Sequence, residues 1–289
     1  MKNNKNLTNP DISIIDEAIQ IVWNKKFNYI FKNKELINNT LVVSYDDLYI
    51  YLWSKNDNVN LEKLYRNESN FNVYRLSHSF TLTDKDKLGW SASIASDLIS
   101  RLLPQEFKKN NFQIPKASGG LYHDFVNTQL KLKGKKDNPY ITRESYLATI
   151  VHEFGHIYYN QHKNWWYSNI EENIDMLSAA LNSYSTQKIF SQTKSFHIPS
   201  PLFFSELYAF LSEISISENL FPTHFKNLKI FAKKRIKELI RLEKLKNLEE
   251  ENSVIGENSP HNTALILGSL IRDTHRTEWV SRILTKITF

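Results

Sequence analysis

The sequence predicts a mainly α-helical fold with a small β-sheet ahead of its central helix. Only 7 of the 289 residues are Gly and 8 are Pro, too few for the dense turns of an all-β sandwich or barrel. Hydrophobic residues make up 41% of the chain and aromatic residues 13%, enough to bury a substantial core. Helical spacing of apolar residues dominates the second half, whereas strand-like segments gather in the first.

The first half mixes helical and strand-like patterns. In the first segment, Ile12, Ile15, Ile19 and Val22 alternate with polar residues, as on an amphipathic helix. Pro104 stops another helical pattern. In order, we expect a helix over 11–32, a strand or buried helix over 40–53, a polar loop over 56–60, a strand over 70–83, a helix over 90–103, irregular chain over 104–120 and a strand-like stretch over 121–132.

The second half predicts a series of helices. The central one begins near Arg143, with Thr142 or Ser145 as its N-cap, and runs to about Tyr159. Pro201 suits the first turn of a later helix, where its missing N–H costs little. The other helices are expected over 170–190, 201–217, 223–251 and 262–284.

The domain organisation follows from length and the absence of linkers. We expect an N-terminal helical or mixed layer over residues 1–110, and a second region over 111–289 that holds the histidine motif described below. No internal repeat or low-complexity linker forces a boundary. The two regions are therefore expected to form one compact unit.

Composition excludes several classes of protein. The absence of Cys excludes a disulfide scaffold, a Cys-ligated zinc site and a cysteine nucleophile. The sequence contains no run of 18 uncharged apolar residues, so we expect no membrane span. The polar N-terminus is not followed by the apolar core of a signal peptide. We therefore expect a cytoplasmic protein.

Positive charge does not by itself predict a nucleic-acid partner. The net charge is +6, with 31 acidic residues present. The basic residues between Lys226 and Lys246 are interleaved with glutamates, which is more typical of a solvated helix face. Nucleic-acid binding is therefore the weakest of the functions that we consider, and we expect no nucleic-acid partner.

The chemistry-bearing motif is His152-Glu153-Phe154-Gly155-His156. Side chains four residues apart share one face of a helix, so His152 and His156 can bind one metal ion. Glu153 is placed to reach a water rather than the metal, as the general base of a zinc peptidase. A glycine inside this helix is best explained by the close approach of another element. The alternative is that both histidines are satisfied core residues.

A third protein ligand is needed, because catalytic zinc usually has three. Glu206 lies 50 residues after His156, in an apolar helical segment where a carboxylate needs a partner. Glu213 is two turns further on the same face, and we expect it to orient a ligand. The alternative source of the third ligand is the acidic cluster Glu171, Glu172 and Asp175.

Three segments resemble the oligoendopeptidase F and thimet oligopeptidase family of gluzincin zinc peptidases. They are residues 116–120 (KASGG), residues 138–141 (NPYI) ahead of His-Glu-Phe-Gly-His, and a helix in which Phe203, Glu206, Ala209 and Glu213 match the family spacing. The resemblance covers roughly residues 116–215. It implies a gluzincin-like catalytic domain, with zinc bound by His152, His156 and Glu206 and with Glu153 as general base.

The chain also departs from this family. It is much shorter than typical members, and the interval between His156 and Glu206 is longer. The family's later His and Tyr, which stabilise the reaction intermediate, have no clean match. His261 is the nearest candidate for this catalytic role, and His275 and Tyr208 are weaker ones. A looser likeness links the chain to single-domain gluzincin toxin proteases.

The leading hypothesis is a zinc-dependent metallopeptidase with one Zn²⁺ per chain and a peptide or protein substrate. The segment from Pro139 to Thr142 could bind substrate backbone as an added strand. The alternative is a catalytically inactive protein of the same fold that binds peptides or a partner protein. The sequence leaves cleavage specificity and oligomeric state open.

Overall fold

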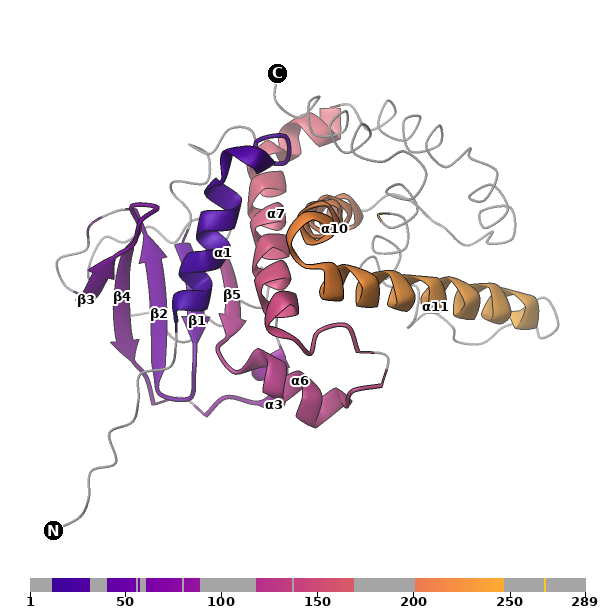
Figure 1. The fold of residues 1–289 in the computed structure, drawn as a ribbon, viewed down its shortest axis with the longest axis horizontal. Coiled ribbons are helices and arrows are strands. Elements are labelled where there is room, and N and C mark those ends of the chain that lie inside the picture. Colours follow the sequence, from indigo (N-terminus) through magenta and orange to yellow (C-terminus); the bar gives the residue numbers. More distant parts are fainter. Residues whose placement is uncertain are drawn as a thin grey trace, which may run out of the picture.

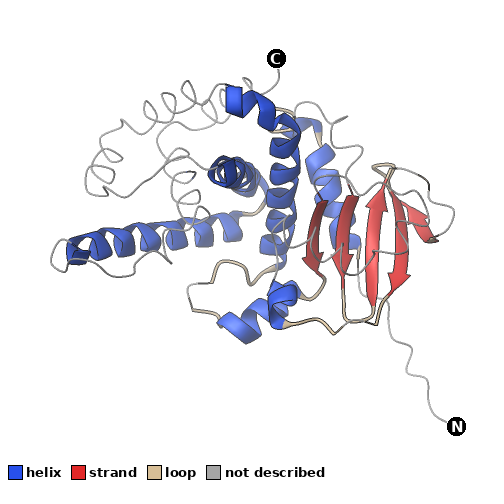
Figure 2. Ribbon diagram, turned by 180° about the vertical axis from the view of Figure 1, so that it is seen from behind, coloured by secondary structure: helices blue, strands red, loops and turns tan. Residues whose placement is uncertain are grey.

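The chain combines helices with one β-sheet (Figures 1 and 2), as the sequence predicts. The computed structural model describes residues 12–31, 41–55, 57, 61–79, 81–88, 118–136, 138–168, 201–246 and 268. Helix α7 (Arg143–Ser168) runs between the sheet and helix α10 (Pro201–Leu220). Helix α11 (Pro222–Lys246) follows α10 after a sharp turn.

The sheet has five strands in the order β3-β4-β2-β1-β5. Its first four members are paired antiparallel, and β5 is parallel to β1. The strands are β1 (Leu41–Tyr45), β2 (Tyr49–Ser54), β3 (Glu62–Arg66), β4 (Asn72–Ser77) and β5 (Ser118–Tyr122). The strand β5 therefore brings the chain to the edge of the sheet nearest α7.

The segment 40–53 forms two strands rather than a buried helix. Asp46 makes the turn between them, because its carboxylate accepts the backbone N–H groups of Leu48 and Tyr49, both at 2.7 Å. The predicted strand over 70–83 is confirmed for residues 72–77, which form β4, whereas residues 70–71, 78–79 and 81–83 are not in a strand. Strand β3 was not predicted, because charged residues flank the adjacent pair Leu64 and Tyr65 and none of its five residues is fully buried, so the sequence shows no alternation.

The strand-like interpretation of 121–132 is wrong beyond Tyr122. The chain turns at His123 and Asp124 and continues as helix α6 (Phe125–Lys133). Phe125 and Gln129, four residues apart, are both fully buried on one side of this helix. The irregular prediction for 118–120 is also wrong, because pairing with β1 supplies the backbone bonds that the local sequence does not signal.

The first helix is shorter than predicted. Helix α1 (Ser13–Trp23) ends at Asn24, which adopts an extended conformation and starts the 3₁₀ helix η1 (Lys25–Phe27) by accepting the Lys26 N–H at 2.9 Å. Asp16 ties α1 to the sheet region. Its carboxylate accepts bonds from three side chains, those of Trp53 at 2.9 Å, Tyr65 at 2.6 Å and Asn67 at 2.7 Å.

The N-terminus of α7 is capped as the sequence predicts. Thr142 Oγ1 accepts the Ser145 N–H at 3.1 Å, while Ser145 Oγ accepts the Thr142 N–H at 2.9 Å. The helix continues beyond the predicted end at Tyr159. Helix α10 begins at Pro201, as expected, and the charged helix α11 begins at Pro222. A short helix, α3 (Asp84–Leu88), precedes them in the chain.

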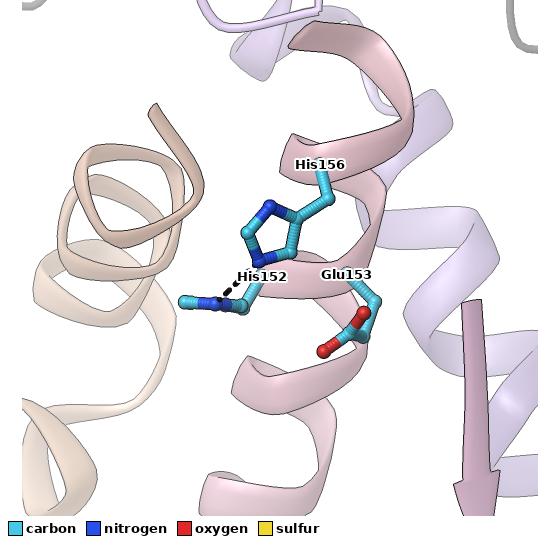
Figure 3. Close-up of side chains that lie close together, drawn as sticks. All are labelled: His152, Glu153 and His156. Atoms are coloured by element: carbon cyan, nitrogen blue, oxygen red, sulfur yellow. Dashed lines mark hydrogen bonds between the residues drawn. The ribbon is translucent and has the colours of Figure 1, made fainter. Parts of the chain in front are cut away.

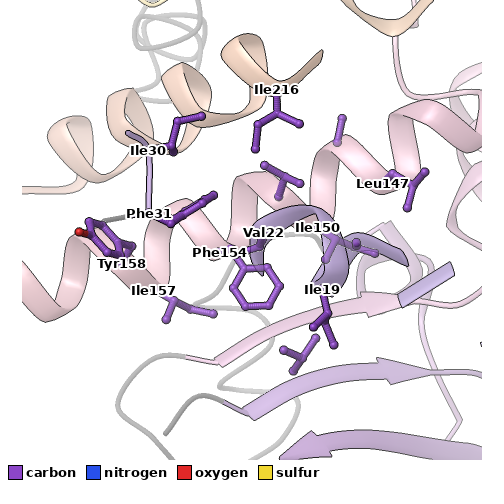
Figure 4. Close-up of a cluster of buried hydrophobic side chains, with 14 of the residues drawn as sticks. Ile19, Val22, Ile30, Phe31, Leu147, Ile150, Phe154, Ile157, Tyr158 and Ile216 are labelled. Atoms are coloured by element: carbon purple, nitrogen blue, oxygen red, sulfur yellow. The ribbon is translucent and has the colours of Figure 1, made fainter. Parts of the chain in front are cut away.

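The main core joins α1, α7 and α10 (Figure 4). Ile19 and Val22 of α1 lie with Ile150 and Phe154 of α7, and all four are at most 4% exposed. The apolar approach to the histidine motif, Leu147, Ile150 and Val151, is buried as predicted. The core thus fixes α7 between the sheet and α10, which leaves its histidine-bearing side toward α10.

The other predicted helices cannot be compared with the structure. Those over 90–103 and 170–190 lie outside the described residues, as does the last one apart from Gly268, which is helical. Within the part of the chain that is described, no helix is both long enough and apolar enough to cross a membrane.

Candidate metal centre

Helix α7 brings His152, Glu153 and His156 together in the interior (Figure 3). All three side chains are buried, at 3–5% exposure, and their donor atoms lie within 4.8 Å of one another. The two imidazole rings meet through their Nε2 atoms, 3.1 Å apart. The spacing of four residues therefore has the consequence expected from helical geometry.

Helix α10 contributes a carboxylate to the same point. Glu206 Oε2 lies 3.5 Å from His152 Nε2 and 3.6 Å from His156 Nε2. Glu206 is 7% exposed, so its charge is largely removed from water. Among the described residues Oε2 has no hydrogen-bond donor, although a buried carboxylate oxygen normally needs one.

These three atoms form a triangle with sides of 3.1, 3.5 and 3.6 Å. Zinc bonds to His nitrogen and carboxylate oxygen are about 2.0–2.1 Å long, so two ligands of a tetrahedral ion lie about 3.3 Å apart. The triangle therefore has the size of one face of such a tetrahedron. The chemical types of the donors, two imidazoles and one carboxylate, also suit zinc.

Each imidazole is oriented through its other nitrogen. His152 Nδ1 lies 3.0 Å from Glu213 Oε2, and His156 Nδ1 lies 2.8 Å from Ser205 Oγ. Since an ionised carboxylate only accepts, the His152 Nδ1–H donates to Glu213. Its Nε2 atom then faces the triangle, where it can bind a metal ion once it has lost its proton. Hydrogen bonds of this kind fix the tautomer and ring orientation of metal-binding histidines.

Burial and ion pairing set the charges of the group. Burial by itself lowers the pKa of His152, but the neighbouring carboxylates of Glu206 and Glu213 prevail and raise it to about 10. Burial lowers the pKa of His156. Although burial opposes it, the two histidine rings at 3.5 and 3.6 Å hold the pKa of Glu206 well below its usual range. Both carboxylates are thus ionised near neutral pH, because the pKa of Glu213 is also lowered by its two histidine neighbours, against the effect of burial.

The glycine within the motif is explained by helix packing, as predicted. A Cβ atom on Gly155 would lie 2.7 Å from Ala209 Cα, a distance that real Cβ atoms essentially never show. The backbones of α7 and α10 therefore approach at this point. The contact lies one residue from His156 and three from Glu206, so it sets the distance between the ligand-bearing helices.

Several candidates from the sequence are not brought into this group. Tyr208 Oη donates to the Ile30 carbonyl at 2.6 Å, and its ring stacks on Tyr158; these contacts account for its hydroxyl without any role in stabilising an intermediate. The segment from Pro139 to Thr142 forms no strand. The remaining candidates, His261, His275, Glu171, Glu172 and Asp175, lie outside the described residues.

Two residues of the site carried no signal in the sequence. Ser205 lies beside Glu206, but nothing in a lone serine predicts that it contacts a histidine. His224 lies on α11, and its Nε2 atom is 2.7 Å from Glu213 Oε1. Only the crossing of α11 with α10 brings these two residues together, and local sequence patterns do not encode that crossing.

Comparisons with known proteins give no further evidence about this site. No protein-family model, curated protein or solved structure matches this chain.

Proposed function

We propose that this protein is a zinc-dependent metallopeptidase that hydrolyses peptide bonds in a peptide or protein substrate. The observation that carries the proposal is the triangle of His152 Nε2, His156 Nε2 and Glu206 Oε2, which matches one face of a tetrahedral zinc site. The resemblance to the gluzincins rests on the same residues, and we propose a catalytic domain of that type.

The residues have distinct roles in this proposal. His152, His156 and Glu206 hold the ion, while Glu213 and Ser205 fix the orientation of the two rings. When bound, zinc supplies a Lewis acid that polarises the substrate carbonyl and lowers the pKa of water. A site with three protein ligands keeps the open position that this chemistry requires.

Glu153 acts as the general base. Its carboxylate lies beside the imidazoles (Figure 3). Glu153 takes the proton of the attacking water and then delivers it to the leaving amine. Positioned proton transfer of this kind contributes about 10²–10⁴-fold to the rate.

Replacing Glu153 by Gln separates metal binding from catalysis. We expect the Glu153→Gln protein to keep about one zinc per chain and to cleave a peptide library about 10²–10⁴-fold more slowly than the wild type. Glu218→Gln is the matched control, because Glu218 is an exposed residue of α10. Cleavage is followed by mass spectrometry, and zinc by elemental analysis of the same samples.

Two results would contradict the proposal. Unchanged turnover in Glu153→Gln would exclude this residue as the base. A wild type that binds zinc but cleaves nothing in the library would favour the alternative, a protein that binds peptides or a partner without hydrolysing them.

A further inference from the structure

We propose that His224 is a positioning residue of the metal centre, acting on His152 through Glu213. This inference rests on the proposed zinc site and extends it to a third helix. His224 lies in the first turn of α11 and is fully buried. It does not touch the three proposed ligands, and nothing in its own sequence segment marks it.

A continuous chain of contacts leads from His224 to the metal position. His224 Nε2 lies 2.7 Å from Glu213 Oε1, and Glu213 Oε2 lies 3.0 Å from His152 Nδ1. The Glu213 carboxylate is 1% exposed, so these two histidines occupy both of its oxygens in an interior without bulk water. One carboxylate thus links an imidazole of α11 to an imidazole of α7.

The donor and acceptor roles in this chain are fixed by chemistry. On its other side, His224 Nδ1 lies 3.3 Å from the Pro139 carbonyl oxygen. A carboxylate can only accept, so the His224 Nε2–H donates to Glu213. This hydrogen bond satisfies one oxygen of a carboxylate that is removed from water.

The consequence for His152 is geometric. A carboxylate held at only one oxygen can rotate about its terminal torsion, which has a broad energy profile. The donor from His224 fixes the second oxygen, so Oε2 stays directed at His152 Nδ1. This keeps the proton of His152 on Nδ1 and its Nε2 lone pair toward the metal position.

His224 is also held by helix α7 and by the loop that precedes it. Its backbone N–H donates to Glu144 Oε2 of α7 at 3.0 Å, and the Tyr140 ring packs on its imidazole, with centroids 5.7 Å apart. The ring is therefore fixed independently of Glu213. A preset donor is what a positioning role requires.

Two neutral variants separate this role from simple packing. In the Gln variant, the amide nitrogen occupies nearly the position of His224 Nε2, so it can still donate to Glu213. In the Asn variant, the amide nitrogen occupies nearly the position of His224 Nδ1, so it can donate only to the Pro139 carbonyl. We expect His224→Gln to bind zinc within about threefold of the wild type and His224→Asn to bind about tenfold more weakly, the lower end of the effect for residues that orient a ligand.

The measurement is zinc affinity, obtained by competition with a chromophoric chelator. Ser212→Ala is the matched control, because Ser212 is a fully buried neighbour of Glu213 whose hydroxyl donates to the Tyr208 carbonyl of its own helix. It should bind zinc as the wild type does. The Glu213→Gln variant completes a double-mutant cycle, in which His224→Asn should cause no further loss.

The outcomes separate this inference from the proposed function. Zinc binding by the wild type with equal affinities in the Asn and Gln variants would overturn the role of His224 alone. Weaker binding in Gln than in Asn would also overturn it and would assign His224 to anchoring Pro139. A wild type that binds no zinc would contradict the metal centre itself.

Discussion

His152 and His156 are the same residue type on the same helix face, yet their surroundings drive their charges in opposite directions. His152 lies between two carboxylates, and their proximity raises its pKa to about 10 against the effect of burial. His156 faces a serine hydroxyl at its Nδ1, and burial lowers its pKa. In the metal-free protein at neutral pH, His152 therefore carries a proton on each nitrogen, whereas His156 is neutral.

This difference predicts that zinc uptake releases a proton. Zinc needs the His152 Nε2 lone pair, while Nδ1 keeps its proton toward Glu213. At pH 7.5, below the raised pKa of His152, binding should release about one proton per zinc. Apparent zinc affinity should accordingly increase as the pH rises toward 10. Calorimetric titrations in two buffers of different ionisation enthalpy measure the number of protons directly.

The Glu213→Gln variant is the control for this prediction, because it removes one cause of the raised pKa. Its proton release at pH 7.5 should be smaller than that of the wild type. Release near zero in the wild type would show that His152 is already neutral, contrary to the charges described above.

At the scale of elements, the contact between α7 and α10 sets the geometry of the site. Two of the proposed ligands lie on α7 and one lies on α10, so the distance between the helices fixes the size of the triangle. The two helices approach closely at Gly155, where an added Cβ would meet the Ala209 backbone at 2.7 Å. A backbone atom cannot rotate away, so the helices must separate.

Replacing Gly155 by Ala should therefore weaken both the fold and the site. We expect a loss of about 1–3 kcal/mol in unfolding free energy, as for other overpacked cores, together with weaker zinc binding. Chemical denaturation and chelator competition measure the two effects. Unchanged stability and zinc affinity would refute the close approach of the helices.

Gly268 offers a matched control for this substitution. It is also helical, but a Cβ there would meet only side-chain atoms of α10, the nearest being Ile214 Cδ1 at 3.4 Å. Gly268→Ala should leave stability unchanged or raise it by up to about 1 kcal/mol, because Ala is the better helix former. It should leave zinc binding unchanged.

At the scale of the whole molecule, the site depends on elements far apart in the sequence. The sheet and α1 support one side of α7, and α10 and α11 pack on it as well. Glu206 reaches the histidines from 50 residues away, and His224 reaches Glu213 across the turn between α10 and α11. The proposed metal site therefore requires the packing of α7, α10 and α11 together.

Local patterns explain what could be predicted. The four-residue spacing of His152 and His156 implies their convergence on any helix, and the Thr142 cap and Pro201 start follow from helix-end chemistry. Gly155 indicated that another element of the fold approaches closely, but not which element. Glu206 could be proposed as a ligand because a carboxylate in an apolar segment needs a partner.

Tertiary contacts explain what could not be predicted. β3 is too polar to show a buried face, and Ser118–Gly120 of β5 depends on a parallel partner more than 70 residues earlier. The contacts of Ser205 and His224 depend on how helices cross. No local pattern of residues contains that information.

The zinc content of purified protein is the decisive measurement for the proposed metal centre. We would measure it by elemental mass spectrometry in the wild type, in Glu206→Gln and in the exposed control Glu218→Gln. We expect about one zinc per chain in the wild type and in Glu218→Gln, and much less in Glu206→Gln, because that change weakens a proposed ligand. A full zinc complement in Glu206→Gln would contradict Glu206 as the third ligand, and a wild type without zinc after reconstitution would contradict the metal centre.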